Sequence, residues 1–405
     1  MKFFKLFIIF ILLFSFSFFI YADDLNESID NTAIATSSDS VFEPEIYSRR
    51  ALVFERNSKT VLFEKNSKEQ CKMASTTKIM TSILILENCN LSDMVTVSAK
   101  AGGTTGSRLG IHADDSISVN DLLYGLMLCS GNDTAVALAE YCSGSVEEFA
   151  NLMNHKAQEL QLSSTHFVTP HGLDNDEHYT TAYDFAILTD YAMNNPLFLQ
   201  IVGTKYYTVS INGISKSIHN TNELLGVIPS VYGIKTGYTS GAGRCLITAA
   251  KENNLDIIVI VFGADTKKIR TDDSSKLINY IFSNYEAIDL SKLVSDKYNE
   301  YTSFLLPLID IPKSSGSLTT KLDNINYSYY PVKKELINSV SVSIETVDLS
   351  APVNENQIVG NINVYLNNSK IFGTNILSSS YISKKSSFDY FFYFVNNYKN
   401  FYKVY

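Results

Sequence analysis

QCKMASTTKIMTSILILE, residues 70–87, contains a serine three positions before a lysine, followed by a run of apolar side chains. These apolar residues recur at the i, i+4 spacing of a helix with one buried face. Ser75 and Lys78 allow two interpretations. Ser75 is either a helix cap with a solvated lysine one turn later, or a nucleophile with Lys78 as its base. Because S-x-x-K also occurs by chance, the rest of the chain must decide between them.

Two further short motifs follow in the chain. The motif S-G-N at 130–132 lies in a predicted loop between two apolar helical runs, LLYGLMLC at 122–129 and TAVALAEYC at 134–142. The motif K-T-G at 235–237 ends the predicted strand VYGIKTG, which begins at residue 231. Each motif is weak evidence alone. All three in this order, each on the expected kind of element, are a strong signal for one class of serine enzyme.

The three motifs and their surroundings resemble the serine D-alanyl-D-alanine carboxypeptidases, or low-molecular-mass penicillin-binding proteins. The resemblance covers about residues 45–290, including SGNDTAVALAE, PHGLD and KTGYTSGAGRCLITAA. It implies an α+β fold: a penicillin-binding, serine β-lactamase-like catalytic domain followed by a small all-β domain. The implied activity is removal of the terminal D-alanine from peptidoglycan stem peptides. It implies that no cofactor and no metal are needed, and that β-lactam antibiotics bind as substrate mimics.

The resemblance also assigns the catalytic residues. Ser75 would attack the D-Ala–D-Ala peptide bond and form an acyl-enzyme, which water then hydrolyses. One helical turn places Ser75 and Lys78 on the same face, so Lys78 can be the base if burial and nearby cations keep it neutral. Ser130 would relay a proton to the leaving amine. The backbone N–H groups of Ser75 and Tyr238 would form the oxyanion hole.

The remaining implied site residues hold the substrate. Asn132 would bind its peptide backbone, Lys235 would add positive potential, and Thr236 would bind the terminal carboxylate. Gly237 lets the substrate lie close to the strand because it has no side chain. Arg270 falls where the family has an arginine that helps to recognise the carboxylate. Its other interpretation is a surface charge at the start of a helix.

Composition limits the class of protein and its partners. The chain has 405 residues, which favours two domains, and its 45% hydrophobic and 19% charged content is typical of a folded globular protein. The formal net charge is −9 and no basic block stands out. This argues against a nucleic-acid partner, because phosphate binding needs clustered lysine and arginine.

The N-terminus has the pattern of a secretory signal. Lys2 and Lys5 precede the apolar run LFIIFILLFSFSFFIYA, and a polar segment begins after Ala22. We therefore predict a signal peptide at 1–22 and export to the outer face of the bacterial cytoplasmic membrane or into the cell wall. An uncleaved anchor is the alternative, since the run is near the lower length of a membrane span. Residues 23–45 are acidic and rich in Ser and Asn, which indicates a polar tether.

The order of predicted elements favours an α+β catalytic domain at 46–288. A hairpin comes first, then the helical block, then antiparallel strands and a closing helix from Arg270 to about Tyr285. The other predicted strands are ALVFE (51–55), TVLFEK (60–65), RCLITAAK (244–251) and LDIIVIVFGA (255–264). Short alternating runs then indicate an all-β domain at 295–383.

The last segment, 386–405, predicts an amphipathic helix. Its polar residues fall within an arc of about 160°: Asp389, Asn396, Asn397, Lys399, Asn400 and Lys403. Its opposite face carries Phe388, Phe391, Phe394, Val395, Tyr398, Phe401, Tyr402 and Tyr405. A helix of this kind suits contact with a membrane surface as an anchor. The alternative is packing against the β domain.

Three rival functions stay open. A serine β-lactamase would use the same acylation, but the E-x-x-L-N pattern of class A enzymes is absent. A zinc D,D-peptidase could use His166 and Asp174, yet no convincing E-x-x-H partner follows. His166, His171 and His178 are therefore interpreted as hydrogen-bonding loop residues. A wall-binding protein with an inactive site is the third rival.

The five cysteines are spread along the chain without close pairs, which is not the pattern of a disulfide framework. We expect them to be small buried apolar residues. Cys129 precedes the S-G-N motif and could be a reactive thiol, although a core role is preferred.

Overall fold

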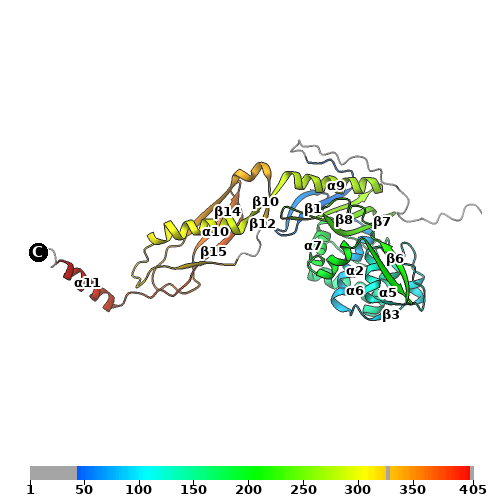
Figure 1. Ribbon diagram of the computed structural model, residues 1–405, viewed down its shortest axis with the longest axis horizontal. Helices are drawn as coiled ribbons and strands as arrows, with labels where there is room; N and C mark the ends of the chain where they lie inside the picture. The colour runs from blue at the N-terminus through cyan, green and yellow to red at the C-terminus, as the bar shows by residue number, and fades with distance from the viewer. Residues whose placement is uncertain (1–42, 325–328, 402–405) are drawn as a thin grey trace, which may run out of the picture. The chain divides into compact units, whose positions relative to one another are not determined.

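The computed structural model describes residues 43–324 and 329–401 (Figure 1). The predicted signal peptide and all but the last three residues of the predicted tether lie outside the described residues. Contacts divide the chain into two compact units. Of the described residues, the first unit contains those up to Val53, Phe63–Ala250 and Ile258–Leu277, and the second contains Phe54–Leu62, Lys251–Ile257 and those from Ile278 onward.

A five-stranded sheet is built around the predicted strands, in the order β2-β1-β9-β8-β7. Its strands are β1 (Arg50–Glu55), β2 (Thr60–Lys65), β7 (Val231–Thr239), β8 (Gly243–Glu252) and β9 (Leu255–Ala264). β9 is buried along its whole length, as expected for an apolar central strand. β7 pairs antiparallel with β8 and puts Lys235 opposite Ile247, so the K-T-G motif lies on an edge strand of this sheet.

Helices lie on both sides of this sheet, with α9 on one side and α2, α5, α6 and α7 on the other (Figure 1). Their bounds, with those of the neighbouring short helices, are α2 (Lys78–Asn88), α3 (Ala99–Gly102), α4 (Val119–Met127), α5 (Asn132–Ser143), α6 (Val146–Glu159), α7 (Ala182–Ala192), α8 (Pro196–Gly203) and α9 (Lys267–Asn284). α2 is buried on all sides from Lys78 to Ile85, so it is a core helix and not a surface helix with one apolar stripe.

Two helix starts agree with the sequence and two do not. Ser118 and Ser145 cap α4 and α6, each accepting a hydrogen bond from a backbone N–H three residues later. Ser75 does not cap α2 through its side chain, because it lies in the preceding 3-10 turn, η1 (Ala74–Thr77). The prediction that Arg270 begins a helix is also wrong. α9 begins at Lys267, and Arg270 points inward with no exposed surface.

A second, four-stranded sheet of the first unit was not predicted. Its order is β3-β4-β5-β6, with β3 (Met94–Thr96), β4 (Ser116–Ser118), β5 (Tyr206–Ile211) and β6 (Ile214–His219). β3 and β4 are three residues long, and most residues of β6 are exposed. Such short or solvated strands lack the apolar alternation on which a sequence prediction depends.

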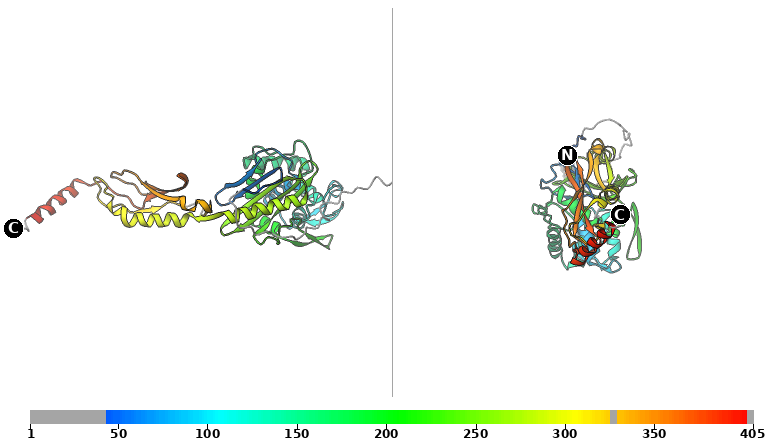
Figure 2. Two further views of the ribbon diagram at one scale, coloured as in Figure 1. Left: turned by 90° about the horizontal axis from the view of Figure 1, so that it is seen from above. Right: turned by 90° about the vertical axis from the view of Figure 1, so that its left-hand side faces the viewer.

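The second unit contains the β-rich region and has its own core. A four-stranded sheet runs β11-β15-β14-β13, and β10 pairs with β12. The strands are β10 (Tyr285–Asp289), β11 (Thr320–Leu322), β12 (Tyr329–Lys333), β13 (Val340–Thr346), β14 (Ile358–Leu366) and β15 (Ser369–Ser378). The helix α10 (Leu290–Glu300), absent from the sequence prediction, lies along this sheet (Figure 2). Its Leu290 and Val294 join the core that Ile362 and Ile376 contribute from the sheet. Short helical turns follow at η2 (Tyr301–Leu305), η3 (Leu306–Leu308) and η4 (Lys334–Ser339).

The predicted C-terminal helix is present as α11 (Ser387–Phe401). Its aromatic side chains are exposed, Phe388 and Tyr393 by about seven-tenths of their surface. In the described residues, no helix combines the length and the apolar character that crossing a membrane requires.

Candidate active site

Ser75 lies in a tight turn whose backbone is held by its neighbours. Thr76 and Thr77 donate their hydroxyl protons to the carbonyl oxygens of Met73 and Ala74, at 2.6 and 2.8 Å. These bonds use the threonine side chains and leave the Ser75 hydroxyl for other partners. Ala74 has a φ of 48°, a left-handed conformation that is uncommon outside glycine and is often found at functional sites.

The amine of Lys78 joins the first two motifs. Its Nζ lies 2.9 Å from Ser75 Oγ, 3.3 Å from Ser130 Oγ and 2.6 Å from Asn132 Oδ1. Lys78 has no exposed surface, and Ser130 and Asn132 are almost fully buried. Four polar side chains from two distant segments therefore converge on one buried point at the start of α2 and of α5.

The loop that carries Ser130 is fixed at both ends. Ser130 has a φ of 60°, and the following Gly131 donates its backbone N–H to the Gly125 carbonyl at 3.1 Å. Asn132 begins α5, and its amide group donates to the Thr105 carbonyl at 2.8 Å while its Oδ1 accepts from Lys78. The orientation of the Asn132 amide is therefore set by two partners.

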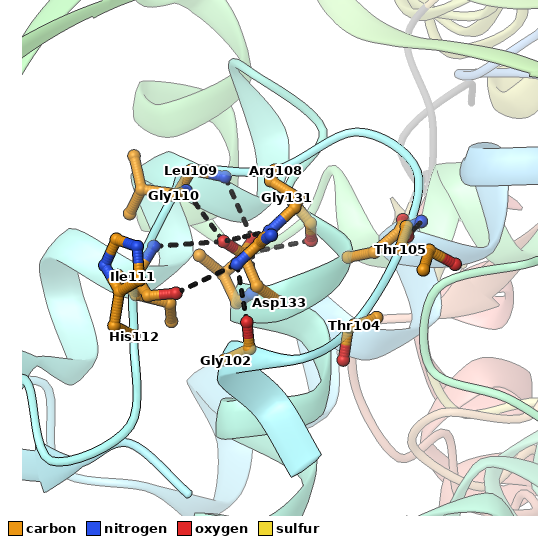
Figure 3. A network of polar contacts seen from close by, with 12 residues as sticks. Gly102, Thr104, Thr105, Arg108, Leu109, Gly110, Ile111, His112, Gly131 and Asp133 are labelled. Carbon is orange, nitrogen blue, oxygen red and sulfur yellow. Dashed lines mark hydrogen bonds and ion pairs between the residues drawn. The ribbon is translucent and has the colours of Figure 1, made fainter. Parts of the chain in front are cut away.

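Asp133, which follows this loop, binds the backbone of segment 108–111 (Figure 3). Its buried carboxylate accepts backbone N–H bonds from Leu109, Gly110 and Ile111 at 2.9, 2.7 and 3.2 Å. Arg108 Nε lies 3.8 Å from the same carboxylate. A buried carboxylate with several charge-assisted donors is a strong local constraint, so Asp133 holds segment 108–111 against the start of α5.

We expect Asp133→Asn to unfold at lower temperature and to lose activity. Asparagine keeps the shape but has one acceptor oxygen instead of two, so buried N–H groups lose partners and Arg108 loses its counter-charge. The loss of unfolding free energy should be about 2–4 kcal/mol, measured by urea denaturation. The matched control is Asp114→Asn, an exposed aspartate in the neighbouring turn. A loss below about 0.5 kcal/mol in Asp133→Asn would contradict the anchoring role.

The K-T-G motif lies on β7 directly beside the serine turn. A Cβ atom added to Gly237 would lie 3.0 Å from the Ser75 backbone nitrogen and 3.1 Å from Ala74 Cβ, so only glycine allows this close approach. Lys235 is buried and donates from Nζ to the Thr236 carbonyl at 3.0 Å. Tyr238 follows, with the Arg244 guanidinium 3.9 Å from its ring centroid.

Two residues outside the motifs support Thr236 and Arg270. The hydroxyl groups of Thr221 and Thr236 are 2.7 Å apart. Two positions later, Glu223 accepts two 2.8 Å hydrogen bonds from Arg270 Nη2 and pairs with Lys267 at 3.0 Å. Arg270 therefore reaches the K-T-G strand through segment 221–223.

Comparison with known proteins agrees with this geometry. The D-alanyl-D-alanine carboxypeptidase family model matches residues 37–266. The model "Penicillin-binding protein 5, C-terminal domain" matches residues 320–384. The chain is 35% identical over 321 residues to D-alanyl-D-alanine carboxypeptidase DacF of Bacillus subtilis, covering 78% of this chain and 80% of that protein.

The chain belongs to the D-alanyl-D-alanine carboxypeptidase family. It is also 33% identical over 362 residues to D-alanyl-D-alanine carboxypeptidase DacC of Escherichia coli, covering 84% and 85% of the two chains. A solved structure of penicillin binding protein 5 from Haemophilus influenzae is similar with a TM-score of 0.69 and 27% identity, over 85% of this chain and all of that one. The predicted fold class and serine carboxypeptidase activity are confirmed at the level of this family.

The PHGLD segment of this carboxypeptidase (residues 170–174) has a structural explanation. Gly172 has a φ of 85°, and a Cβ atom there would lie 1.9 Å from the Ala74 carbonyl oxygen, so a larger residue would displace the serine turn. Asp174 accepts hydrogen bonds from Thr239 Oγ1 at 2.6 Å and from the Gly241 backbone at 2.8 Å. Asp174, a zinc ligand in the rival interpretation, thus holds the turn after β7.

The three loop histidines make hydrogen bonds to the chain around them, as interpreted from the sequence. His166 Nδ1 lies 2.6 Å from the Glu177 carbonyl, and His171 Nδ1 accepts from the Leu173 N–H at 3.2 Å. In the part of the chain that the structure describes, no group of three or more His, Cys, Asp or Glu side chains could hold a metal ion. Burial lowers the pKa of His171 to about 3.

His178 supports the serine turn as a neutral ring. Its Nδ1 accepts from the Val168 N–H at 2.9 Å, which leaves Nε2 as the donor to Thr77 Oγ1 at 2.8 Å. A charged ring would put two N–H groups against each other at Val168. Burial lowers the pKa of His178 to about 4, in agreement with this tautomer.

We therefore expect stability to fall as the pH decreases from about 6.5 to about 4. Between the ordinary histidine pKa and the lowered pKa of folded His178, the unfolded chain binds the extra proton and the folded chain does not. The measurement is an NMR titration of the imidazole resonances beside thermal unfolding at several pH values. Titration of His178 near 6.5 would contradict the neutral-ring assignment.

Cys129 is partly exposed and not part of the core, yet its thiol is not the reactive group of the alternative interpretation. Its thiol lies 3.1 Å from the Gly125 carbonyl oxygen, and burial raises its pKa to about 11. A thiol that stays protonated at neutral pH is a poor nucleophile. The wider expectation that the cysteines are buried is wrong for four of the five. Cys245 is buried, whereas the others are partly exposed, because they lie at helix ends and in loops: Cys71, Cys89, Cys129 and Cys142.

Hydrogen bonds join four of the nine predicted site residues, Ser75, Lys78, Ser130 and Asn132. Gly237 lies beside the Ser75 turn, on the strand that also carries Lys235, Thr236 and Tyr238. Arg270 is linked to this strand through segment 221–223. Sequence reasoning missed Asp133, Thr221 and Glu223, which touch site residues but carry no motif of their own. Asp133 had one available signal, since it follows Asn132 at the start of a helix, where a carboxylate is favoured.

Proposed function

We propose that this chain removes the terminal D-alanine from peptidoglycan stem peptides through an acyl-enzyme on Ser75. One observation carries the proposal. The buried Lys78 Nζ lies within 2.9 Å of Ser75 Oγ and within 3.3 Å of Ser130 Oγ. A nucleophile and an amine base at hydrogen-bond distance are what activation of a serine requires.

In the first step, Ser75 Oγ attacks the carbonyl carbon of the D-Ala–D-Ala bond and Lys78 accepts its proton. Burial disfavours the charged form of an amine, which helps Lys78 to act as a base. Ser130 then passes a proton to the leaving amine, and D-alanine departs. The backbone N–H groups of Ser75 and Tyr238 hold the developing oxyanion, a role consistent with the close approach of β7 to the serine turn.

Substrate binding uses the other motif residues. Asn132 holds the peptide backbone, and Thr236 holds the terminal carboxylate beside the positive charge of Lys235. Thr221 orients the Thr236 hydroxyl across their 2.7 Å contact. We assign Arg270 an indirect part in carboxylate recognition. Its Nη2 donates to Glu223, which lies two residues after Thr221, and Thr221 in turn contacts Thr236.

The decisive experiment measures release of D-alanine from diacetyl-lysyl-D-Ala-D-Ala, with and without penicillin or a metal chelator. We expect steady release that penicillin blocks and a chelator leaves unchanged. Release that the chelator abolishes and penicillin ignores would support the zinc rival. Rapid penicillin turnover without D-alanine release would support the β-lactamase rival. No release and no penicillin adduct would support a binding protein with an inactive site.

We further propose that the chain is exported and that α11 contacts a membrane surface. Support for export is the basic start and apolar run of residues 1–22, which predict a cleaved signal. N-terminal sequencing of the mature protein from fractionated cells should give a start at Asp23. A full-length chain in the cytoplasmic fraction would contradict export.

Support for membrane contact is the exposed aromatic face of α11, including Phe391 and Phe394. The full chain should co-sediment with anionic phosphatidylglycerol vesicles, and Phe391→Asp/Phe394→Asp should lose most of this binding. Tyr206→Asp, an exposed aromatic on β5, is the matched control and should leave binding unchanged. Equal sedimentation of all three proteins would overturn the proposal.

A further inference from the structure

Two cysteines meet where α2 and α5 end. Cys89 is the C-cap residue of α2, and Cys142 lies in the last turn of α5, one residue before its final residue Ser143. The two thiols are hydrogen-bonded to each other. Both residues are partly exposed.

At their N-terminal ends, the same two helices carry Lys78 and Asn132 of the proposed active site. α2 begins at Lys78 and has 11 residues, and α5 begins at Asn132 and has 12. Lys78 Nζ and Asn132 Oδ1 are 2.6 Å apart at the beginning of the pair. Two helices of nearly equal length therefore touch at both ends, through the site at one end and through two thiols at the other.

We propose that Cys89 and Cys142 form a disulfide once the protein meets an oxidising medium, tying together the ends of the two helices that position Lys78 and Asn132. The pair is distant in sequence, which is why cysteine spacing did not reveal it. The inference does not depend on the hydrolytic activity, because it concerns a modification far along both helices from the serine.

The chemistry of the pair favours exchange with an external disulfide. The hydrogen bond with Cys89 lowers the pKa of Cys142 to about 7, so Cys142 has substantial thiolate at neutral pH. The same contact, together with burial, raises the pKa of Cys89, which holds the shared proton. The Cys142 thiolate attacks one sulfur of a disulfide such as oxidised glutathione and releases one thiol. Cys89 then loses its proton to solvent, attacks the Cys142 sulfur of the mixed disulfide and displaces the second thiol.

The remaining cysteines provide a contrast. Burial raises the pKa of Cys71 to about 12 and that of Cys245 to about 11, and Cys129 is raised in the same way. These thiols stay protonated at neutral pH and should react slowly. Cys71 and Cys245 are also electrostatic neighbours, so they form a matched control pair that lacks a thiolate.

The test uses the purified full chain in a buffer of oxidised and reduced glutathione, followed by denaturation, alkylation and peptide mapping. We expect three alkylated cysteines instead of five, and one cross-linked peptide joining Cys89 to Cys142. Cys71→Ser/Cys245→Ser should keep this link. Cys89→Ser should instead leave Cys142 as a mixed disulfide with glutathione, and retained penicillin labelling would show that this variant is folded.

Thermal unfolding gives an independent readout. The oxidised chain should melt roughly 5–10 °C above the reduced chain, and this difference should vanish in Cys89→Ser. Five alkylated cysteines after oxidation, or a link between any other two cysteines, would overturn the proposal. Because neither readout requires D-alanine release, failure here and failure of the proposed function are separate results.

Discussion

Ser75→Ala is expected to reduce D-alanine release by at least about 10⁴-fold, because removal of an attacking oxygen leaves no group to form the acyl-enzyme. Asn132, Ser130 and Lys78 stay in place around the vacated hydroxyl, so substrate binding should change little. The measurement pairs steady-state release with intact mass after incubation with penicillin. Wild type should gain the mass of one penicillin, and Ser75→Ala should gain none.

Ser82→Ala is the matched control for this variant, since Ser82 is a buried serine in α2, the helix that follows the serine turn. It should keep both activity and the penicillin adduct. A penicillin adduct that persists in Ser75→Ala would place the nucleophile elsewhere. Loss of the adduct with retained D-alanine release would separate penicillin binding from catalysis and contradict a shared acyl-enzyme.

Lys78→Met is expected to be nearly as damaging, with a loss of about 10³-fold or more in acylation by both substrate and penicillin. Methionine fills a similar volume but has no amine to accept the Ser75 proton or to contact Asn132 Oδ1. Lys78→Arg should also be inactive, because a guanidinium is always charged and cannot be a base. Lys100→Met, at an exposed lysine paired with Glu147, is the control for loss of a positive charge.

The double variant Ser75→Ala/Lys78→Met distinguishes a catalytic unit from two independent effects. If the lysine acts only through the serine, the double variant should be no less active than Ser75→Ala alone. Thermal unfolding of each protein shows whether a loss reflects folding. Acylation of Lys78→Met within tenfold of wild type would mean that another group is the base.

Local features of the chain were readable from the sequence. The strands of the five-stranded sheet and the caps at Ser118 and Ser145 depend on nearest neighbours and on burial, so periodicity and composition indicate them. The α11 helix was readable for the same reason. The order of three short motifs was enough to predict the family, since each motif needs a particular local element. Where local signals were weak, as in β5 and β6, the prediction failed.

Only the tertiary structure decided which distant residues meet. Three hydrogen bonds join parts of the chain that share no motif. They link Asp133 to segment 108–111, Thr221 to Thr236, and Glu223 to Arg270. The meeting of Cys89 and Cys142 is of the same kind. A hydrogen bond between distant residues leaves no periodicity in either segment, because the spacing of side chains along a helix or strand encodes which face is buried and not which partner it meets.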